Sequence, residues 1–368
     1  MKAPRVGLLQ TIRAKAQINP GLSLWLDEKW GSRHHGWFKS FGRGAVLSTS
    51  IDKYVYITLR HFPPVFDFNY RVVWRMVEQA QTIDDIQHPI VKAVLTHYAA
   101  EHDCGYEISY NADLPARSGL GSSSAFTVAA LHALMGHEGR HVSKMWLAQE
   151  AIRVEQELLK EPVGSQDQTA VAFGGLNRID FGADGSLGVR PLDISINRRL
   201  ELQERLLMFF TGFTRDTSSI ERAKVENFAN RKSQMNRLYE MVDEGESILM
   251  NEGRSIDDFG GLLHQAWQEK RALSAGVSNG PVDRMYDIGL SAGALGGKLL
   301  GAGGGGFMLL FVPPERRESV LNAMSALKFE GGQSPLHVPF RFEREGSSVV
   351  LNQPQLTENY ARSRLNLG

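Results

Sequence analysis

Two glycine clusters constrain this chain more than any other feature of its sequence. The first lies between residues 114 and 125, reads LPARSGLGSSSA, and runs directly into a pattern typical of a helix. Glycines let a backbone approach a ligand closely, and a helix start offers free N–H groups, so this arrangement suits a polyphosphate. The alternative is a capped helix after a flexible loop. The loop is not a Walker A motif, because no Gly-Lys-Ser/Thr follows it.

The second cluster, GGKLLGAGGGG at residues 296–306, precedes the apolar run FMLLFV. Its glycines at 301, 303 and 306 satisfy the spacing of the dinucleotide fingerprint. That fingerprint requires the order strand, glycines, helix, whereas the pattern here predicts helix, glycines, strand. A Rossmann dehydrogenase is therefore disfavoured.

The remaining elements mix helices and strands without regular alternation. The patterns predict strands or hairpins at 45–60, 105–112, 174–191, 206–212 and 306–312, and helices at 122–137, 143–160, 218–253, 256–273 and 282–295. This order favours an α+β fold over a doubly wound sheet. A new unit starts near residue 200, which predicts domains at 1–200 and 201–350 and a tail at 351–368.

The helix predicted from Ser143 to Lys160 carries one misplaced carboxylate. On a helical wheel Glu155 lies inside the apolar arc, where an isolated charge is costly to bury. It must therefore be paired or bind a cation, and a structural salt bridge at the edge of the core remains the alternative. Asp167 follows on a tight turn close to the helix end.

Composition narrows the possible partners and the compartment. Lys plus Arg and Asp plus Glu both number 41, which argues against a nucleic-acid binder that relies on a basic surface. A single cysteine, Cys104, excludes an internal disulfide and fits the reducing cytosol. No apolar stretch approaches the roughly 18–20 residues of a membrane span, and the N-terminal patch is too short for a secretory signal. We expect a cytoplasmic protein with no nucleic-acid and no membrane partner.

The sequence from Pro115 to Ala125 satisfies the pattern Pro-x-x-x-Gly-Leu-Gly-Ser-Ser-x-Ala, and LLGAGGGGF supplies a second glycine loop. On these motifs the chain resembles the GHMP kinase superfamily. The segments GLGSSSAFTVAALHAL, EPVGSQDQTAVAFGGLNRIDF, LLMFFTGFTRD and FGGLLHQAWQEKRALS are similar to kinases of D-glycero-α-D-manno-heptose 7-phosphate. The resemblance implies an N-terminal domain like ribosomal protein S5 domain 2 and a ferredoxin-like C-terminal domain.

The resemblance also implies a site between those domains. ATP would be bound by Pro115, Ser118, Gly119, Leu120, Gly121, Ser122, Ser123, Ser124, Gly303 and Gly304. Mg²⁺ would be held by Ser123 and Glu155, and Asp167 would act on the accepting hydroxyl. Lys298 and Arg215 are candidate cations near the transferred group, with a surface or structural role as the alternative for each.

The implied reaction is ATP-dependent phosphorylation of the anomeric hydroxyl of the heptose 7-phosphate, giving the 1,7-bisphosphate for GDP-heptose and lipopolysaccharide or other surface glycans. The partners would be ATP and a small-molecule sugar phosphate, and the protein would be a monomer or homodimer. A fucokinase-like sugar-1-kinase is one alternative. The other is a non-catalytic nucleotide-binding member, because residues 10–40 lack the Gly-Gly-Gly-Thr-Asp loop of the family.

Overall fold

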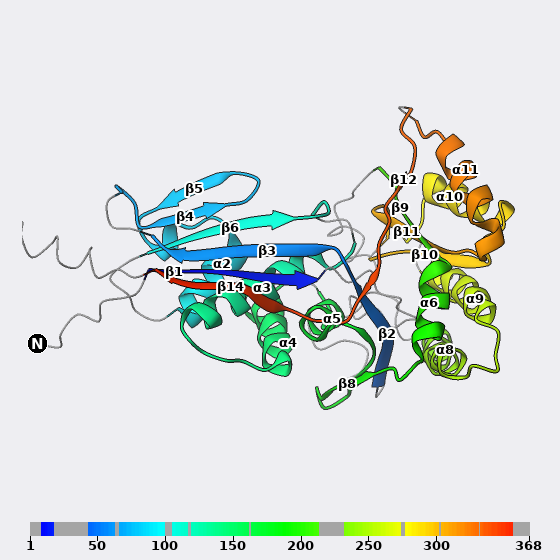
Figure 1. The fold of residues 1–368 in the computed structure, drawn as a ribbon, viewed down its shortest axis with the longest axis horizontal. Coiled ribbons are helices and arrows are strands. Elements are labelled where there is room, and N and C mark those ends of the chain that lie inside the picture. Colours follow the sequence, from blue (N-terminus) through cyan, green and yellow to red (C-terminus); the bar gives the residue numbers. More distant parts are fainter. Residues whose placement is uncertain are drawn as a thin grey trace, which may run out of the picture.

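The computed structural model describes residues 9–17, 43–62, 66–99, 105–116, 119–161, 163–212, 232–273, 277–301, 303–330 and 332–355. These residues form three sheets and the helices that pack against them (Figure 1). The printed strand pairs are antiparallel except β4 with β6. This arrangement confirms the expected α+β class.

The largest sheet has the strand order β14-β1-β3-β6-β4-β5. Its strands are β1 Leu9–Gln17, β3 Tyr54–His61, β4 Tyr70–Val73, β5 Val77–Ala80, β6 Tyr106–Ala112 and β14 Ser348–Gln355. Figure 1 shows the helices α2 Pro89–Tyr98, α3 Ser122–His137 and α4 Lys144–Arg153 on one side of it. Side chains of β3 alternate between buried and half-buried, because one face of the sheet is covered by helices and the other is not.

Helix α3 is the centre of this part of the molecule. It begins at Ser122 and ends at His137, as the sequence predicts, and residues on all sides of it are buried. Its small side chains, among them Ser124, Ala125, Ala129, Ala130 and Ala133, let neighbouring elements pack closely around it. The helix therefore holds its N-terminal end, and the glycines before it, in a fixed position.

The second sheet has the order β13-β2-β7-β8 and lies beside the first. Its strands are β2 Arg43–Ile51, β7 Leu176–Gly182, β8 Leu187–Pro191 and β13 Phe342–Glu343. The predicted strand, Asp-Gly turn and strand at 174–191 is confirmed, with Gly185 in the left-handed region at φ +83°. The short helix α5 Gln166–Phe173 leads into β7.

The third sheet, β10-β11-β9-β12, organises the C-terminal part. Its strands are β9 Leu206–Phe210, β10 Gly296–Leu299, β11 Phe307–Phe311 and β12 Leu336–His337. The helices beside it are α6 Ile196–Glu204, α8 Lys232–Met250, α9 Asp257–Leu273, α10 Gly280–Ser291 and α11 Arg317–Ala326.

Strand β10 corrects one expectation. The second glycine cluster was predicted to follow a helix directly, but its first residues form β10, so the loop joins two strands of an antiparallel pair. The reason is close packing: a Cβ on Gly296 would lie 2.1 Å from the carbonyl oxygen of Gly260 in α9. Only glycine lets the strand and helix approach this closely.

The C-terminal residues of the chain return to the N-terminal part, which the predicted domain limits do not describe. Residue 200 lies inside α6, and residue 350 lies inside β14, which pairs with β1 in the first sheet. Residues 348–355 therefore pack with the N-terminal part (Figure 1). The limits 1–200, 201–350 and 351–368 stay a prediction.

An arginine joins the second sheet to the C-terminal helices. Arg178 of β7 forms ion pairs with Asp243 and Glu246 of α8, at 2.6 and 2.8 Å, and its side chain is 10 % exposed. These bonds come from two partners on one helix, so they fix the orientation of α8 against β7.

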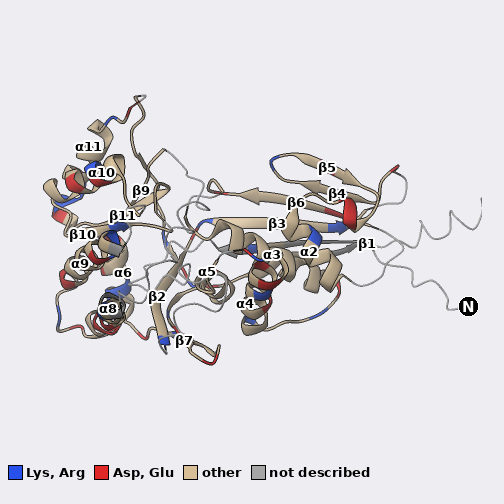
Figure 2. Cartoon of the chain, turned by 180° about the vertical axis from the view of Figure 1, so that it is seen from behind, with Lys and Arg blue, Asp and Glu red and all other residues tan. Residues whose placement is uncertain are grey.

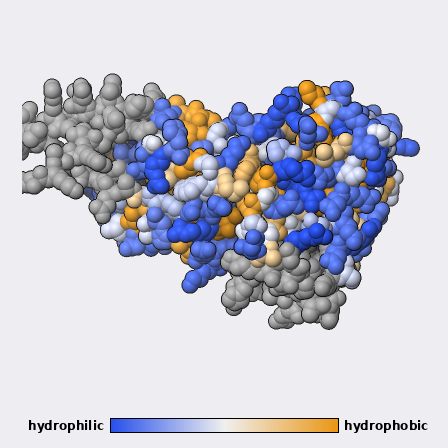
Figure 3. Space-filling view, turned by 90° about the horizontal axis from the view of Figure 1, so that it is seen from below, coloured by the Kyte–Doolittle hydropathy of each residue, from blue (hydrophilic) through white to orange (hydrophobic). Residues whose placement is uncertain are grey.

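Charges on the outer surface are of mixed sign. Figure 2 shows short acidic and basic segments interleaved along the helices of the C-terminal part. The face seen in Figure 3 is mainly hydrophilic, with scattered apolar groups. None of the described helices has both the length and the apolar character that crossing a membrane requires.

His88 gives the fold a predicted acid sensitivity. Its Nδ1 accepts a hydrogen bond from the Val91 backbone N–H at the start of α2, and its ring stacks on Phe126 at 4.6 Å. Burial lowers the pKa of His88 below its usual 6.5. The unfolded chain therefore binds a proton below about pH 6.5 that the folded chain resists, and stability is lost as the pH falls through that range.

We expect His88→Asn to reduce this loss, because asparagine keeps a capping oxygen but does not titrate. Urea unfolding at pH 7.5 and 5.5 measures the effect, which should be about 1 kcal/mol or less. His97→Asn, at an exposed position of the same helix, is the control and should leave the pH dependence unchanged. An equal loss of unfolding free energy between pH 7.5 and 5.5 in wild type and His88→Asn would contradict the role of His88.

Candidate active site

The first glycine loop ends at the N-terminus of α3. Gly119 and Gly121 have φ angles of +82° and +67°, in the left-handed region that favours glycine, and Gly121 is the N-cap of the helix. Helix N-termini leave backbone N–H groups without intrahelical partners and carry positive potential. The loop thus aims N–H donors at the space in front of α3.

The three serines that follow differ in exposure. Ser123 is exposed, whereas Ser122 and Ser124 are buried at the first turn of α3. The Ser124 hydroxyl donates to the carboxylate of Glu155 at 3.1 Å. The hydroxyl closest to solvent is therefore that of Ser123, and Ser124 serves as a link to the neighbouring helix.

Glu155 lies in a π-helical turn, Val154–Leu158, that continues α4. The turn replaces the last part of the predicted α-helix, and such turns are frequent at functional sites. The side chain of Glu155 is fully buried and accepts hydrogen bonds from Thr127, Ser124 and Gln168. Burial raises the pKa of this carboxyl to about 7, because these neutral donors offset only part of the lost hydration.

Asp167 lies directly against the first glycine loop. It belongs to the first turn of α5, and a Cβ on Gly121 would lie 3.1 Å from its Cγ and 3.3 Å from its Oδ2. The residue as a whole is half-buried. Any side chain at position 121 would therefore meet the carboxylate of Asp167.

Gln168 links Glu155 to the helix turn that carries Asp167. It follows Asp167 in α5, and its amide nitrogen donates to Oε2 of Glu155. Glu155, Gln168 and Ser124 are thus bonded together, with Asp167 and Gly121 at one side of the group. Glu155 is thus tied to the first turn of α3 through Ser124, and Asp167 lies beside the N-cap of the same helix.

The second glycine loop packs against the first. A Cβ on Gly119 would lie 2.6 Å from the carbonyl oxygen of Leu300, and one on Gly301 would lie 2.5 Å from the Cα of Gly119. The Gly301 carbonyl also accepts a hydrogen bond from the buried Lys270 of α9, at 3.0 Å. The second glycine loop, in the C-terminal part, therefore packs directly against the first. This close approach requires glycine at both 119 and 301.

The other predicted nucleotide residues vary in position. Pro115 is exposed and Leu120 is buried, so Leu120 offers a ligand its backbone alone. Gly303 and Gly304 are buried, and the Gly304 N–H bonds the carbonyl of Val277. Their contact with a nucleotide stays a prediction. Ser118 and Arg215 lie outside the described residues.

Lys298 lies on β10 and is 5 % exposed. Side chains alternate along a strand, so Lys298 shares the face of Gly296, which α9 covers. Lys298 thus lies in the C-terminal part. That it acts near the transferred group stays a prediction.

Sequence reasoning missed Gln168, Thr127 and Lys270. Gln168 had a usable signal, because it follows Asp167 directly, and Thr127 lies one turn after Ser123. Lys270 had none: it follows Glu269 in a helix whose pattern reads as an ordinary amphipathic one. Its burial comes from the packing of α9 on β10.

The donors at this site fit Mg²⁺. A hydroxyl and a carboxylate are hard oxygen ligands, and Mg²⁺ is usually held by one or two carboxylates together with water and substrate phosphates. A cation beside Glu155 would also offset the cost of burying its charge. No group of three or more His, Cys, Asp or Glu side chains gathers as a metal site in the part of the chain that the structure describes. Glu155 is fully buried and Ser123 is exposed, and their role as ligands of Mg²⁺ stays a prediction.

Family models match both halves of the chain. The one described as GHMP kinases N terminal domain matches residues 89–175, and the one described as GHMP kinases C terminal matches residues 249–329. A D-glycero-alpha-D-manno-heptose 7-phosphate kinase from Campylobacter jejuni is 34 % identical over 237 residues, which cover 64 % of this chain and 67 % of that protein. The chain belongs to the GHMP kinase family.

Members of this family are ATP-dependent phosphotransferases with an alcohol group as acceptor, and this chain is a sugar kinase of that kind. A bifunctional fucokinase/GDP-fucose pyrophosphorylase from Arabidopsis thaliana is 32 % identical over 212 residues. That match covers 56 % of this chain and 20 % of the longer plant protein.

Solved structures share the fold. A D-glycero-D-manno-heptose 1-phosphate kinase from Bacteroides thetaiotaomicron aligns with a TM-score of 0.72 at 23 % identity, covering 92 % of this chain and 99 % of that one. Galactokinase from Lactococcus lactis, complexed with galactose, aligns with a TM-score of 0.67 at 16 % identity, covering 92 % and 95 %. The two-domain GHMP kinase fold predicted from the motifs is confirmed.

Proposed function

We propose that this protein phosphorylates the anomeric hydroxyl of D-glycero-D-manno-heptose 7-phosphate with ATP, giving the 1,7-bisphosphate. The observation that carries the proposal is the closeness of Asp167 to Gly121, which puts a carboxylate beside the first glycine loop. The identity with the Campylobacter jejuni heptose 7-phosphate kinase supports the choice of sugar.

The first glycine loop would hold the phosphates of ATP. Its N–H groups and the start of α3 favour negative charge, and the left-handed φ angles of Gly119 and Gly121 give the loop the turn that leads into the helix. Phosphoryl transfer depends mainly on positioning and on neutralising charge, so a rigid, amide-lined loop is the chemistry that the reaction needs.

Ser123 and Glu155 would hold Mg²⁺ between them and the phosphates. The metal would supply charge neutralisation at the transferred group. Within the protein, the bonds from Thr127 and Gln168 keep the Glu155 carboxylate in one orientation. The exposed hydroxyl of Ser123 lies where the loop opens to solvent.

Asp167 would orient the accepting hydroxyl and take its proton. The carboxylate lies in the first turn of α5, beside the first glycine loop. Lys298 and Arg215 stay candidates for a cation near the transferred phosphate. The product would enter GDP-heptose and surface glycan synthesis in the cytoplasm.

A panel of acceptors tests the sugar assignment. With ATP and Mg²⁺ present, we expect ADP release to be fastest with D-glycero-D-manno-heptose 7-phosphate. The unphosphorylated heptose should be at least about tenfold slower in kcat/KM, because one charge-assisted phosphate contact is worth about 1.5–3 kcal/mol. L-fucose and mannose complete the panel.

A higher rate with L-fucose than with any sugar phosphate would replace the heptose assignment by a fucokinase-like one, which the similarity to the plant fucokinase supports as second candidate. The position of the new phosphate, read by ³¹P NMR of the product, checks transfer to the anomeric oxygen. A product phosphorylated at another hydroxyl would contradict the proposal.

A further inference from the structure

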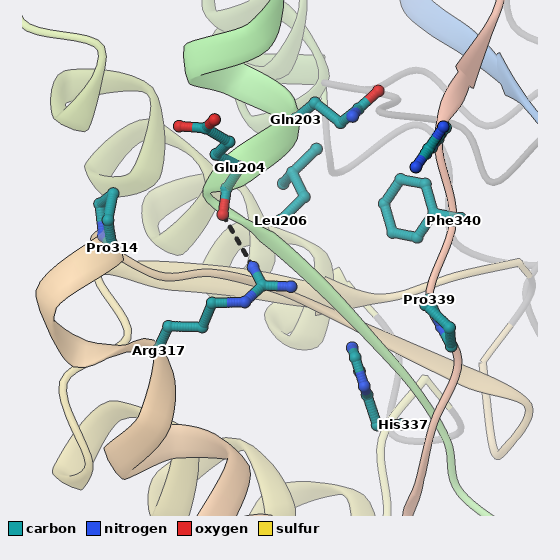
Figure 4. Close-up of a pocket in the computed structure, with 9 residues that line it drawn as sticks. Gln203, Glu204, Leu206, Pro314, Arg317, His337, Pro339 and Phe340 are labelled. Carbon is teal, nitrogen blue, oxygen red and sulfur yellow. Dashed lines mark hydrogen bonds between the residues drawn. The ribbon is translucent and has the colours of Figure 1, made fainter.

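A pocket of about 310 Å³ lies on the C-terminal part (Figure 4). It is bounded by the end of α6, the start of α11 and the segment that follows β12. Strand β9 begins beside it at Leu206 and ends at Phe210, and the hydroxyl of the next residue, Thr211, donates to the Gly306 carbonyl of the second glycine loop. None of the residues that line the pocket belongs to either glycine loop or to the group around Glu155 and Asp167.

The pocket is rich in positive charge. Arg317, His337 and Arg341 line it, with Glu204 as the acidic residue among its lining residues. Figure 4 shows the Glu204 carboxylate directed away from Arg317, while its backbone carbonyl accepts the bond from Arg317 Nη1 at 2.9 Å. The guanidinium is thus held in place by a neutral acceptor, and its charge is not neutralised by that bond.

The positive charges at this pocket are those of Arg317 and Arg341. Burial and the charge of Arg317 lower the pKa of His337. The backbone N–H of Arg341 donates to the carboxylate of Asp52. That carboxylate is also paired with Lys53. Among the ion pairs of the described residues, the side chains of Arg317 and Arg341 have none.

Apolar groups form the rest of the wall. Leu206, Pro314, Pro339 and Phe340 line the pocket, and Figure 4 shows the Phe340 ring on the side across from Arg317. A guanidinium that faces an aromatic ring across a small pocket suits a ligand with a charged end and a ring. The volume is at the lower end of the usual range for small-molecule sites.

We propose that this pocket binds a small phosphate monoester whose ring packs against Phe340, at a site separate from the kinase reaction. Arg317 and Arg341 would bind the phosphate oxygens, since arginine donors match phosphate geometry. The ester could come from a sugar phosphate or a nucleoside monophosphate, and both share the chemistry recognised here.

The resonance of the His337 ring reports the site directly. NMR titrations of the full chain with inorganic phosphate, mannose 6-phosphate and GMP, with His337→Asn to assign the signal, give the pKa of His337 and a dissociation constant for each probe. We expect at least one ester to raise that pKa by about one unit, because a dianion replaces part of the repulsion from Arg317. We expect the ester to bind about tenfold tighter than inorganic phosphate.

Variants separate this site from the active site. Arg317→Gln and the exposed Arg341→Gln should each weaken ester binding about tenfold, and Arg317→Gln should also raise the pKa of His337 without ligand. Glu204→Gln should leave binding unchanged or tighter, and Arg316→Gln, outside the pocket, should leave it unchanged. Asp167→Asn should not affect the His337 response.

The preferred ester identifies the source: tighter binding of mannose 6-phosphate indicates a sugar phosphate, and tighter binding of GMP indicates a nucleotide. A His337 signal that no probe shifts at millimolar concentration would overturn the site. A response to inorganic phosphate as tight as that to both esters would overturn the ring contact. Neither outcome bears on the kinase assignment, which the acceptor panel tests separately.

Discussion

Asp167→Asn is expected to lower kcat by about 10²–10⁴-fold, the usual contribution of a positioned general base. Asparagine keeps the size of the side chain beside Gly121 but cannot take a proton from the accepting hydroxyl. The KM for ATP should stay within a few-fold of wild type, because the loop N–H groups are untouched. Coupled ADP-release kinetics give kcat and KM separately.

Stability should change little in the same variant. A negative charge in the first turn of α5 is worth about 0.3–1 kcal/mol, so thermal unfolding should shift by no more than that amount. Asp193→Asn, at an exposed position, serves as the control and should leave kcat unchanged. A kcat for Asp167→Asn equal to that of wild type would show that Asp167 is not the base, and the residue that takes the proton would then have to be another one.

Glu155→Gln is expected to separate activity from stability. If the carboxylate holds Mg²⁺, its loss should raise the Mg²⁺ concentration for half-maximal rate by about tenfold or more. The unfolding free energy should be unchanged or higher, because a neutral amide avoids the cost of a fully buried charge. The hydroxyls of Thr127 and Ser124 can accept from the new amide as well as donate.

Glu157→Gln is the matched control, since Glu157 lies in the same π-helical turn but is exposed. It should change neither the Mg²⁺ requirement nor the stability. Mg²⁺ titrations at saturating ATP and urea unfolding give the two quantities. A variant at position 155 with lower stability and an unchanged Mg²⁺ requirement would make Glu155 a structural residue of the core.

Local patterns predicted the elements well where short-range physics decides them. The limits of α3, the hairpin from Leu176 to Pro191 and strand β11 follow from periodicity and turn residues within about ten positions. The burial of Glu155 followed from the helical wheel, because the neighbours of a helix face are set by its own repeat.

Long-range contacts could not be predicted in the same way. Strand β14 pairs with β1 from the opposite end of the chain, and β10 forms because Gly296 packs on Gly260. No local pattern encodes these partners. The bond between Lys270 and Gly301 likewise joins residues that only the packing of α9 brings together.

The sequence alone indicated the class of chemistry, because its two glycine motifs resemble those of the GHMP kinases, although each feature taken singly also allows a structural role. It also determined which residues to examine. The tertiary structure decided which of them meet: Asp167 at Gly121, Glu155 at Ser124, and Gly119 at Gly301. The physical reason is that residue type and local repeat fix what a segment can do, whereas the packing of distant segments fixes what stands opposite it.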